Sequence, residues 1–364
     1  MTYETFMAEG LFRSPLNDAC GITSGGNVMT EMNLTRRQAL LGAAAAAGAS
    51  TLTGLDLQPA AAKAPLSKEQ VPYFYRFNHG SMQATVISDG PIPLGDPSGA
   101  FLGASKEEIS KLLTDNFLSP TNAVLEQNIL VVNTGDKLLL VDTGMGSSTM
   151  FGPTTGKMMA SLKAAGIDPK DIDGVLATHA HCDHVWGIMG DDGKPNFPNA
   201  QIYISQADFD FWTDEKKLEM KDPAFMKPFV EGARKNLLPV RDRIVFVKDG
   251  QEFLPGIQAI ATPGHTVGHT IFMITSNGKS LAAIGDLTHH QILLVEKPRF
   301  EFAYDTDPKQ SANSRVRILD MLASQKIPLV AYHFPWPGHG HVAKQGDGFR
   351  YFPASMQMVL DMKT

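Results

Sequence analysis

The stretch Thr178-His179-Ala180-His181-Cys182-Asp183-His184 directly follows the apolar run Gly174-Val175-Leu176-Ala177. Imidazole and carboxylate side chains together are the ligands that proteins use for zinc, iron, cobalt or manganese. Alternate residues of an extended chain face the same way, so His179 and His181 can bind one metal ion from the end of a strand. If the chain then turns, Asp183 and His184 can face a second metal ion. The stretch therefore predicts a two-metal site.

Three more apolar segments of the chain end near a residue that can bind a metal ion. His265 lies in a Pro/Gly turn after a strand-like run, and Asp286 and His333 each end an apolar run. A rigid sheet gathers ligands that are distant in sequence in this way, at one edge of its strands. We therefore expect these three residues to join the first four.

These motifs resemble the metallo-β-lactamase superfamily, whose pattern is H-x-H-x-D-H, a His in a TPGHT-like turn, Gly-Asp, and a late His. Within it, the chain resembles the methyl parathion hydrolases, which are secreted organophosphate-degrading enzymes. The resemblance runs from about Tyr75 to the C-terminus, and it implies an α/β fold, the αβ/βα four-layer sandwich. Stretches outside the ligands that carry it include Val132-Asn133-Thr134-Gly135, Phe151-Gly152-Pro153-Thr154 and Phe334-Pro335-Trp336-Pro337.

The resemblance also divides the seven ligands between two divalent metal ions. These are His179, His181 and His265 for the first ion, Asp183, His184 and His333 for the second, and Asp286 for both. Zinc is the expected metal, with iron, cobalt or manganese as alternatives. A hydroxide bridging the ions would attack the substrate. Asp286 would fix the spacing of the metal ions and accept the proton of the hydroxide. This chemistry needs no Ser or Cys nucleophile, and the chain lacks a G-x-S-x-G elbow.

Two further side chains are expected behind the ligands. Asp142, in an Asp-Thr-Gly turn, would orient the loops that carry them, with a simple turn-forming role as the alternative. His269 stands where many members of the superfamily have Ser. It is either a structural donor or a group that supports the ligands.

An apolar pocket is expected beside the metal ions. The resemblance places Phe151, Trp212 and Phe225 or Phe229 around the leaving group, with core packing as the alternative for each. An apolar pocket without an Arg clamp favours a small neutral ester, lactone or phosphotriester over a phosphate monoester or nucleic acid.

His289, three residues beyond Asp286, is predicted to be catalytic, with packing as the alternative. Lactone-cleaving relatives carry a Tyr there that assists the carbonyl, and parathion-hydrolysing relatives carry an apolar residue. The main hypothesis is a phosphotriester hydrolase, with a lactonase (for acyl-homoserine or related lactones) or an aryl esterase as alternatives. An iron-dependent oxidoreductase of the same fold and a metal-binding protein without catalysis are more remote, and His181 argues against a flavin-linked di-iron enzyme.

The N-terminal region predicts export. Arg36 and Arg37 precede an uncharged, Ala- and Gly-rich stretch and Ala-x-Ala sites, as in a twin-arginine signal peptide. The stretch is too short and too weakly apolar for a stable membrane anchor. We expect 1–64 to be an upstream extension and signal, starting at Met1 or Met32, and 65–364 to be one hydrolase domain in the periplasm or outside the cell.

Composition and periodicity agree with a soluble enzyme. A net charge of −6 over 364 residues gives no electrostatic footprint for nucleic acid, and the resemblance favours a homodimer. A capping box at Ser105-Lys106-Glu107-Glu108 predicts a helix to about Asn116. Further helices are predicted at 154–165, 206–212, 214–238 and 315–324. Strands are predicted at 84–88, 128–133, 137–141, 200–204, 244–247, 257–261, 270–275, 280–284 and 329–332.

Overall fold

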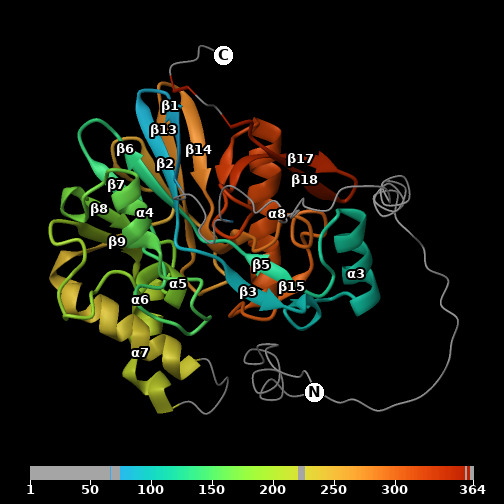
Figure 1. Ribbon diagram of the computed structural model, residues 1–364, viewed down its shortest axis with the longest axis horizontal. Coiled ribbons are helices and arrows are strands. Elements are labelled where there is room, and N and C mark those ends of the chain that lie inside the picture. The colour runs from blue at the N-terminus through green and yellow to red at the C-terminus, as the bar shows by residue number, and fades with distance from the viewer. Residues whose placement is uncertain (1–65, 67–73, 220–225, 357–358, 361–364) are drawn as a thin grey trace, which may run out of the picture. The chain divides into compact units, whose positions relative to one another are not determined.

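The computed structural model describes residues 66, 74–219, 226–356 and 359–360 (Figure 1). The predicted extension and signal at 1–64 therefore lie outside the described residues. The described chain forms two seven-stranded sheets with helices on their outer faces, which confirms the predicted α/β sandwich.

The first sheet brings three segments of the site to one edge. Its order is β1-β2-β6-β7-β8-β9-β10, and β7 to β10 run parallel. Because parallel strands end at the same edge, the segments that follow β7, β8 and β9 start side by side. The bounds are β1 Phe74–His79, β2 Met82–Ser88, β6 Asn128–Asn133, β7 Leu138–Val141, β8 Gly174–Leu176, β9 Gln201–Ser205 and β10 Ile244–Val247.

The second sheet brings the segments that carry the later ligands to one edge. Its order is β11-β12-β13-β14-β16-β17-β18, with β14 and β16 parallel. The β12–β13 turn and the ends of β14 and β16 therefore share one edge. The bounds are β11 Glu252–Leu254, β12 Ile257–Ala261, β13 Thr270–Ser276, β14 Lys279–Ala283, β16 Leu329–Val330, β17 His339–Gln345 and β18 Gly348–Pro353.

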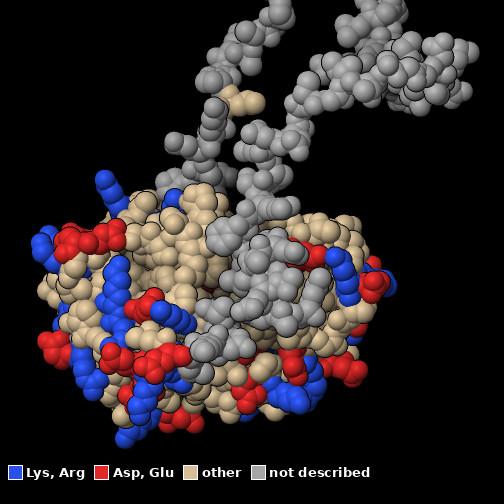
Figure 2. All heavy atoms as spheres, turned by 90° about the horizontal axis from the view of Figure 1, so that it is seen from below, with Lys and Arg blue, Asp and Glu red and all other residues tan. Residues whose placement is uncertain are grey.

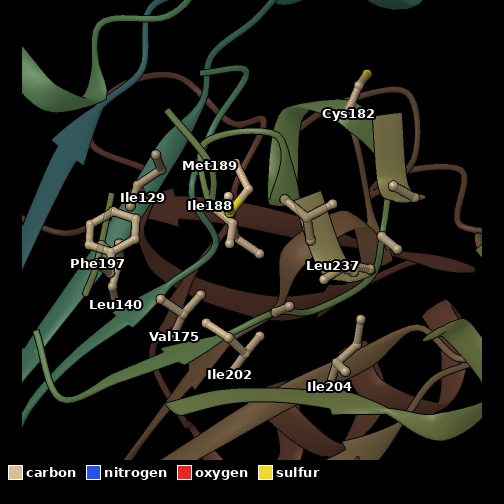
Figure 3. Close-up of a cluster of buried hydrophobic side chains, with 14 of the residues drawn as sticks. Ile129, Leu140, Val175, Cys182, Ile188, Met189, Phe197, Ile202, Ile204 and Leu237 are labelled. Atoms are coloured by element: carbon tan, nitrogen blue, oxygen red, sulfur yellow. The ribbon is translucent and has the colours of Figure 1, made fainter. Parts of the chain in front are cut away.

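Three buried clusters define the four layers. The first packs helices α4, α6 and α7 onto the outer face of the first sheet, the second fills the space between the sheets, and the third packs α8 onto the second sheet. Figure 3 shows strand side chains such as Val175 and Ile202 in the same cluster as Leu237 of α7. The helices are α3 Lys106–Asp115, α4 Met158–Ala164, α5 Cys182–Val185, α6 Gln206–Thr213, α7 Met226–Leu237 and α8 Pro308–Gln325.

The remaining described elements are short strands outside the two large sheets and 3-10 helices. Two small ribbons pair β3 with β5 and β4 with β15. Their bounds are β3 Ile92–Gly95, β4 Phe101–Leu102, β5 Ala123–Leu125 and β15 Glu301–Phe302. The 3-10 helices are η1 Pro97–Gly99, η2 Pro169–Asp171, η3 Glu215–Glu219, η4 Leu238–Arg243 and η5 Gly285–Leu287.

Several local predictions are confirmed, and others are wrong in their bounds. Ser105 caps α3 by accepting the Glu108 N–H at 3.2 Å. The predicted helix 154–165 begins only at Met158, because Gly156 takes a left-handed φ of +75°. The helix predicted at 315–324 is longer and begins at Pro308, since Asp307 caps it by accepting the Gln310 N–H at 3.0 Å. The β17–β18 hairpin was not predicted.

Charged side chains are mixed on the face shown in Figure 2. Acidic and basic side chains alternate around an area that carries few charges. None of the helices within the described residues is both long enough and apolar enough to cross a membrane.

Because His290 is buried in its neutral form, we expect acid to destabilise the fold. Its Nδ1 accepts the Ile292 and Leu293 N–H groups at 3.1 and 3.2 Å, and burial lowers its pKa to about 4. An unfolded chain, with a His pKa of about 6.5, binds more protons below that pH. The contribution of His290 is therefore complete above pH 6.5 and falls as the pH drops toward 4, by up to about 3 kcal/mol.

His290→Asn retains an acceptor near the position of Nδ1 but cannot be protonated. We expect the stability difference between the two proteins, measured by urea unfolding, to shift in favour of the variant between pH 6.5 and 4. Parallel curves for the wild type and the variant would contradict this prediction.

Candidate metal centre

Seven buried His and Asp side chains meet at the edge shared by the two sheets. They form two groups, in each of which the potential ligand atoms lie within 4.8 Å of one another. The groups are His179, His181 and His265, and Asp183, His184, Asp286 and His333. The structure thus brings together all seven residues that the sequence assigned to a metal site.

The local backbone explains how four of them come from one short stretch. β8 ends at Leu176, and His181 is the N-cap of the one-turn helix α5. The extended segment presents His179 and His181 together, and the helical turn then directs Asp183 and His184 to the second group.

Asp286 lies between the two groups and contacts both. Its Oδ1 is 3.1 Å from His184 Nε2, and its Oδ2 is 3.2 Å from His333 Nε2 and 3.3 Å from His265 Nε2. A carboxylate whose oxygens lie near ligands of both groups occupies the position that a bridging ligand requires.

Unsatisfied atoms in the centre indicate that the residues fit metal ions. His181 Nε2, His184 Nε2 and Asp286 Oδ1 are buried, and no hydrogen bond among the described residues satisfies them, although the last two atoms lie 3.1 Å apart. Moreover, His265 Nε2 and His179 Nε2 face each other at 3.2 Å. Buried polar atoms left without partners are destabilising, and a coordinated cation would satisfy them.

Burial and neighbouring charge set the protonation of the imidazoles. Burial lowers the pKa of His179 and His181 well below the usual value, which favours the neutral form that binds metals. Burial opposes protonation of His265 and His333 as well, but their carboxylate neighbours raise the pKa values to about 9 and about 10. Metal binding at these two residues would therefore release protons.

Asp142 contacts the ligand His184 from behind. Its Oδ2 is 2.9 Å from His184 Nδ1, and its Oδ1 accepts the Thr178 N–H at 2.8 Å. Asp142 has a left-handed φ of +65°, a conformation that Asp tolerates better than most residues. The carboxylate thus fixes the ring of His184 and the start of the His-rich segment.

His269 contacts the backbone of the central carboxylate residue. Its Nε2 accepts the Asp286 N–H at 3.0 Å, and its Nδ1 lies 2.7 Å from Thr262 Oγ1. Of the two open interpretations, the geometry corresponds to a group that supports a ligand loop.

Two buried carboxylates near the centre were not predicted from the sequence. Asp305 Oδ1 lies 2.8 Å from His265 Nδ1, and fully buried Arg315 approaches the other oxygen at 3.7 Å. Asp208 accepts the backbone N–H of Ala180 at 2.6 Å. Neither residue belongs to a local motif. Ser205 caps α6 by accepting the Asp208 N–H at 3.1 Å, so Asp208 lies in the first turn of that helix.

A cavity opens onto the two groups, and its walls are mainly apolar. Phe151 and Phe229 line it, as predicted, but Trp212 does not. Trp212 is fully buried behind His181, with ring centroids 4.8 Å apart, because α6 packs its inner face into the core. Phe225 lies outside the described residues. Other apolar and aromatic residues that line the cavity were not predicted; they are Ile92, Pro93, Leu94, Leu125, Phe302 and Tyr304.

His289 lines the same cavity, beside the central carboxylate. Its Nε2 is 3.0 Å from Asp286 Oδ2, and its ring stacks on Phe302 with centroids 3.9 Å apart. Burial lowers its pKa to about 4, so the imidazole is neutral near pH 7. A neutral imidazole carries one N–H and can donate one hydrogen bond.

Comparisons with known proteins agree with this geometry. The chain is similar to the solved structures of AidC, a dizinc quorum-quenching lactonase in complex with a product, and of hydrolase AbOPH in the β-lactamase superfamily. The identities are 30% and 29%; each alignment has a TM-score of 0.74 and covers 79% of this chain and 100% of the other. An N-acyl homoserine lactonase of Bacillus cereus is 23% identical over 273 residues, which are 70% of this chain and 96% of the relative.

The narrower resemblance to methyl parathion hydrolases stays a prediction. A family model described as "Metallo-beta-lactamase superfamily" matches residues 123–333. This match covers more than half of the chain and includes all seven clustered residues. The protein therefore belongs to the metallo-β-lactamase superfamily and is a metal-dependent hydrolase.

Proposed function

We propose that this protein is a lactonase that opens the ring ester of neutral lactones with an apolar substituent. The observation that carries the proposal is the apolar cavity, which opens directly onto the two His/Asp groups. Similarity to AidC and to the Bacillus cereus enzyme supports a lactone over other neutral esters.

The seven clustered residues would hold two divalent ions, and zinc suits their nitrogen and oxygen ligands. Two such ions, when bound, acidify a shared water and polarise a carbonyl oxygen. Asp286, which contacts both groups, would hold the water's proton as the ester bond breaks. His289 would donate its N–H to the oxygen of the ester carbonyl, where negative charge grows.

The cavity lining favours a neutral substrate. No Lys or Arg occurs among the described residues that line it, so an anionic group would find no ion-pair partner beyond the metal site. Its apolar walls from β3, β5 and β15 suit an aliphatic or aromatic substituent. Phosphotriesters and aryl esters meet the same criterion and are the alternative substrates.

A comparison of substrates tests the proposal. We would measure kcat/KM on an acyl-homoserine lactone, an aryl ester and a dialkyl aryl phosphotriester, together with metal content and oxygen consumption. The lactone should give the highest kcat/KM. A higher value for the phosphotriester would establish the parathion-hydrolase alternative, and metal-dependent oxygen consumption would show an iron oxidoreductase instead.

We further propose that the protein is exported through the twin-arginine route, based on Arg36, Arg37 and the uncharged stretch behind them. Replacing both with Lys should leave the protein in the cytoplasm, because the charge remains but the receptor no longer reads the pair. Cell fractionation followed by an activity assay measures this. Normal export of the Lys-Lys variant, or export in a strain without the twin-arginine system, would refute the proposal.

A further inference from the structure

We propose that Asp208 is a positioning residue that sets the geometry of the first metal-binding group, His179, His181 and His265. The inference rests on the proposed binding of two metal ions. Asp208 lies in the first turn of α6, directly after β9, and its side chain is fully buried.

One carboxylate connects two loops that belong to different sheets. Asp208 Oδ2 accepts the Ala180 N–H at 2.6 Å, and Oδ1 accepts the Gly268 N–H at 2.9 Å. Ala180 stands between the ligands His179 and His181, after β8 of the first sheet. Gly268 lies in the β12–β13 turn of the second sheet, three residues after His265. Asp208 therefore fixes the distance between the two halves of this group.

The close approach of the second loop is itself part of the arrangement. A Cβ atom on Gly268 would lie 2.1 Å from Ser205 Oγ and 2.5 Å from Asp208 N. Only glycine fits at such a separation, so the turn that carries His265 rests directly on the first turn of α6. This contact and the hydrogen bond from Gly268 to Asp208 join the same two elements, α6 and the β12–β13 turn.

The chemistry of Asp208 is not explained by the needs of α6 alone. Among the described residues, no Lys or Arg forms an ion pair with it. A buried carboxylate without a cation is destabilising, so an apolar residue would serve simple packing better. The two N–H groups reach different oxygens of Asp208, however, and an amide of the same shape would place an NH2 donor where one of these acceptor oxygens lies.

The contacts of Asp208 are selective for one group. Its hydrogen bonds reach the segments of the first group and none of the ligands of the second. Asp142 instead contacts His184, a ligand of the second group, with Oδ2 at 2.9 Å from Nδ1. Asp142 thus supports a ligand of the second group, whereas Asp208 supports the first group together with Asp305, which contacts His265. Loss of Asp208 should therefore weaken the binding of one metal ion and spare that of the other.

The test is Asp208→Asn, with Asp210→Asn as the matched control. Asp210 lies on the same helix and is exposed. We would titrate zinc and cobalt into both variants and the wild type against a competing chelator, and record the visible cobalt spectrum, which reports ligand geometry. Asp208→Asn should weaken the binding of one ion by about tenfold to a hundredfold and leave the affinity for the other within about threefold of the wild-type value. The cobalt spectrum should change for the weakened ion only, and Asp210→Asn should match the wild type.

Equal weakening of both ions, or unfolding of the variant in the presence of zinc, would show that Asp208 serves the fold as a whole and would overturn the proposal. Unchanged binding would overturn it as well. Because the readout is metal binding, failure to hydrolyse lactones would refute the proposed function alone. A wild-type protein that binds no ion at the first group would refute both.

Discussion

Asp286→Ala is expected to lose both metal ions and hydrolysis together. The Asp286 carboxylate is the only group whose oxygens contact both clusters of potential ligands within the described chain, at 3.1 Å from His184 and 3.3 Å from His265. Its removal would also leave His184, His265 and His333 close together without the anion that stabilises their positive charge. Metal ions contribute several kcal/mol to such reactions, so activity should fall roughly a thousandfold or more.

Elemental analysis and kcat/KM on the best substrate measure this result. The wild type should contain about two equivalents of metal, as expected for a dinuclear centre. Asp320→Ala, an exposed carboxylate on α8, is the control and should keep both metal and activity. An active Asp286→Ala protein, or full wild-type activity with a single equivalent, would rule out the two-metal site.

His289→Ala should lower kcat on lactones by about a hundredfold without changing metal content. Its Nε2 lies 3.0 Å from Asp286 Oδ2, so in this structure its single N–H is directed at that carboxylate, and the proposed role requires this N–H to pass from Asp286 to the reacting oxygen of the substrate. A donor to a developing negative charge typically contributes on the order of 3 kcal/mol to the transition state. Phosphotriesters with very good leaving groups need less stabilisation of the transition state, so the fall in kcat on these substrates should be smaller.

Two further variants separate hydrogen bonding from packing. His289→Gln keeps an N–H donor and should recover part of the lost kcat, whereas His290→Asn changes the neighbouring imidazole and should leave kcat near the wild-type value. The ring of His289 stacks on Phe302, so a packing role would instead raise KM for all substrates alike. Equal and minor changes on lactones and phosphotriesters would show that His289 does not take part in the reaction.

Much of the centre could be predicted because its chemistry is local. His179, His181, Asp183 and His184 lie within one short stretch, and only a few residue types bind metals. Strand periodicity then placed three more ligands at strand ends. The sandwich fold was predicted from the same pattern together with the resemblance. The ligands in the later segments could be predicted without knowing which contacts bring the segments together.

The supporting residues could not be predicted, because their partners are distant in sequence. Asp208 contacts Ala180 and Gly268, and Asp305 contacts His265, 40 positions away. A single Asp in a helix or loop carries no pattern that distinguishes it from a solvated surface residue. Only the pairing of the two sheets brings these carboxylates to the ligand loops.

The sequence by itself therefore determined the superfamily, the seven clustered residues and the positions of most strands of the two large sheets, since these depend on residue type and spacing. Tertiary structure alone decided which apolar side chains face the substrate cavity. Phe151 and Phe229 line it, whereas Trp212 packs behind His181. Leu94 and Phe302, which also line it, come from the small ribbons. The hydrophobic effect has no direction, so an apolar side chain fills a core or a cavity wall equally well until the packing of its neighbours decides between them.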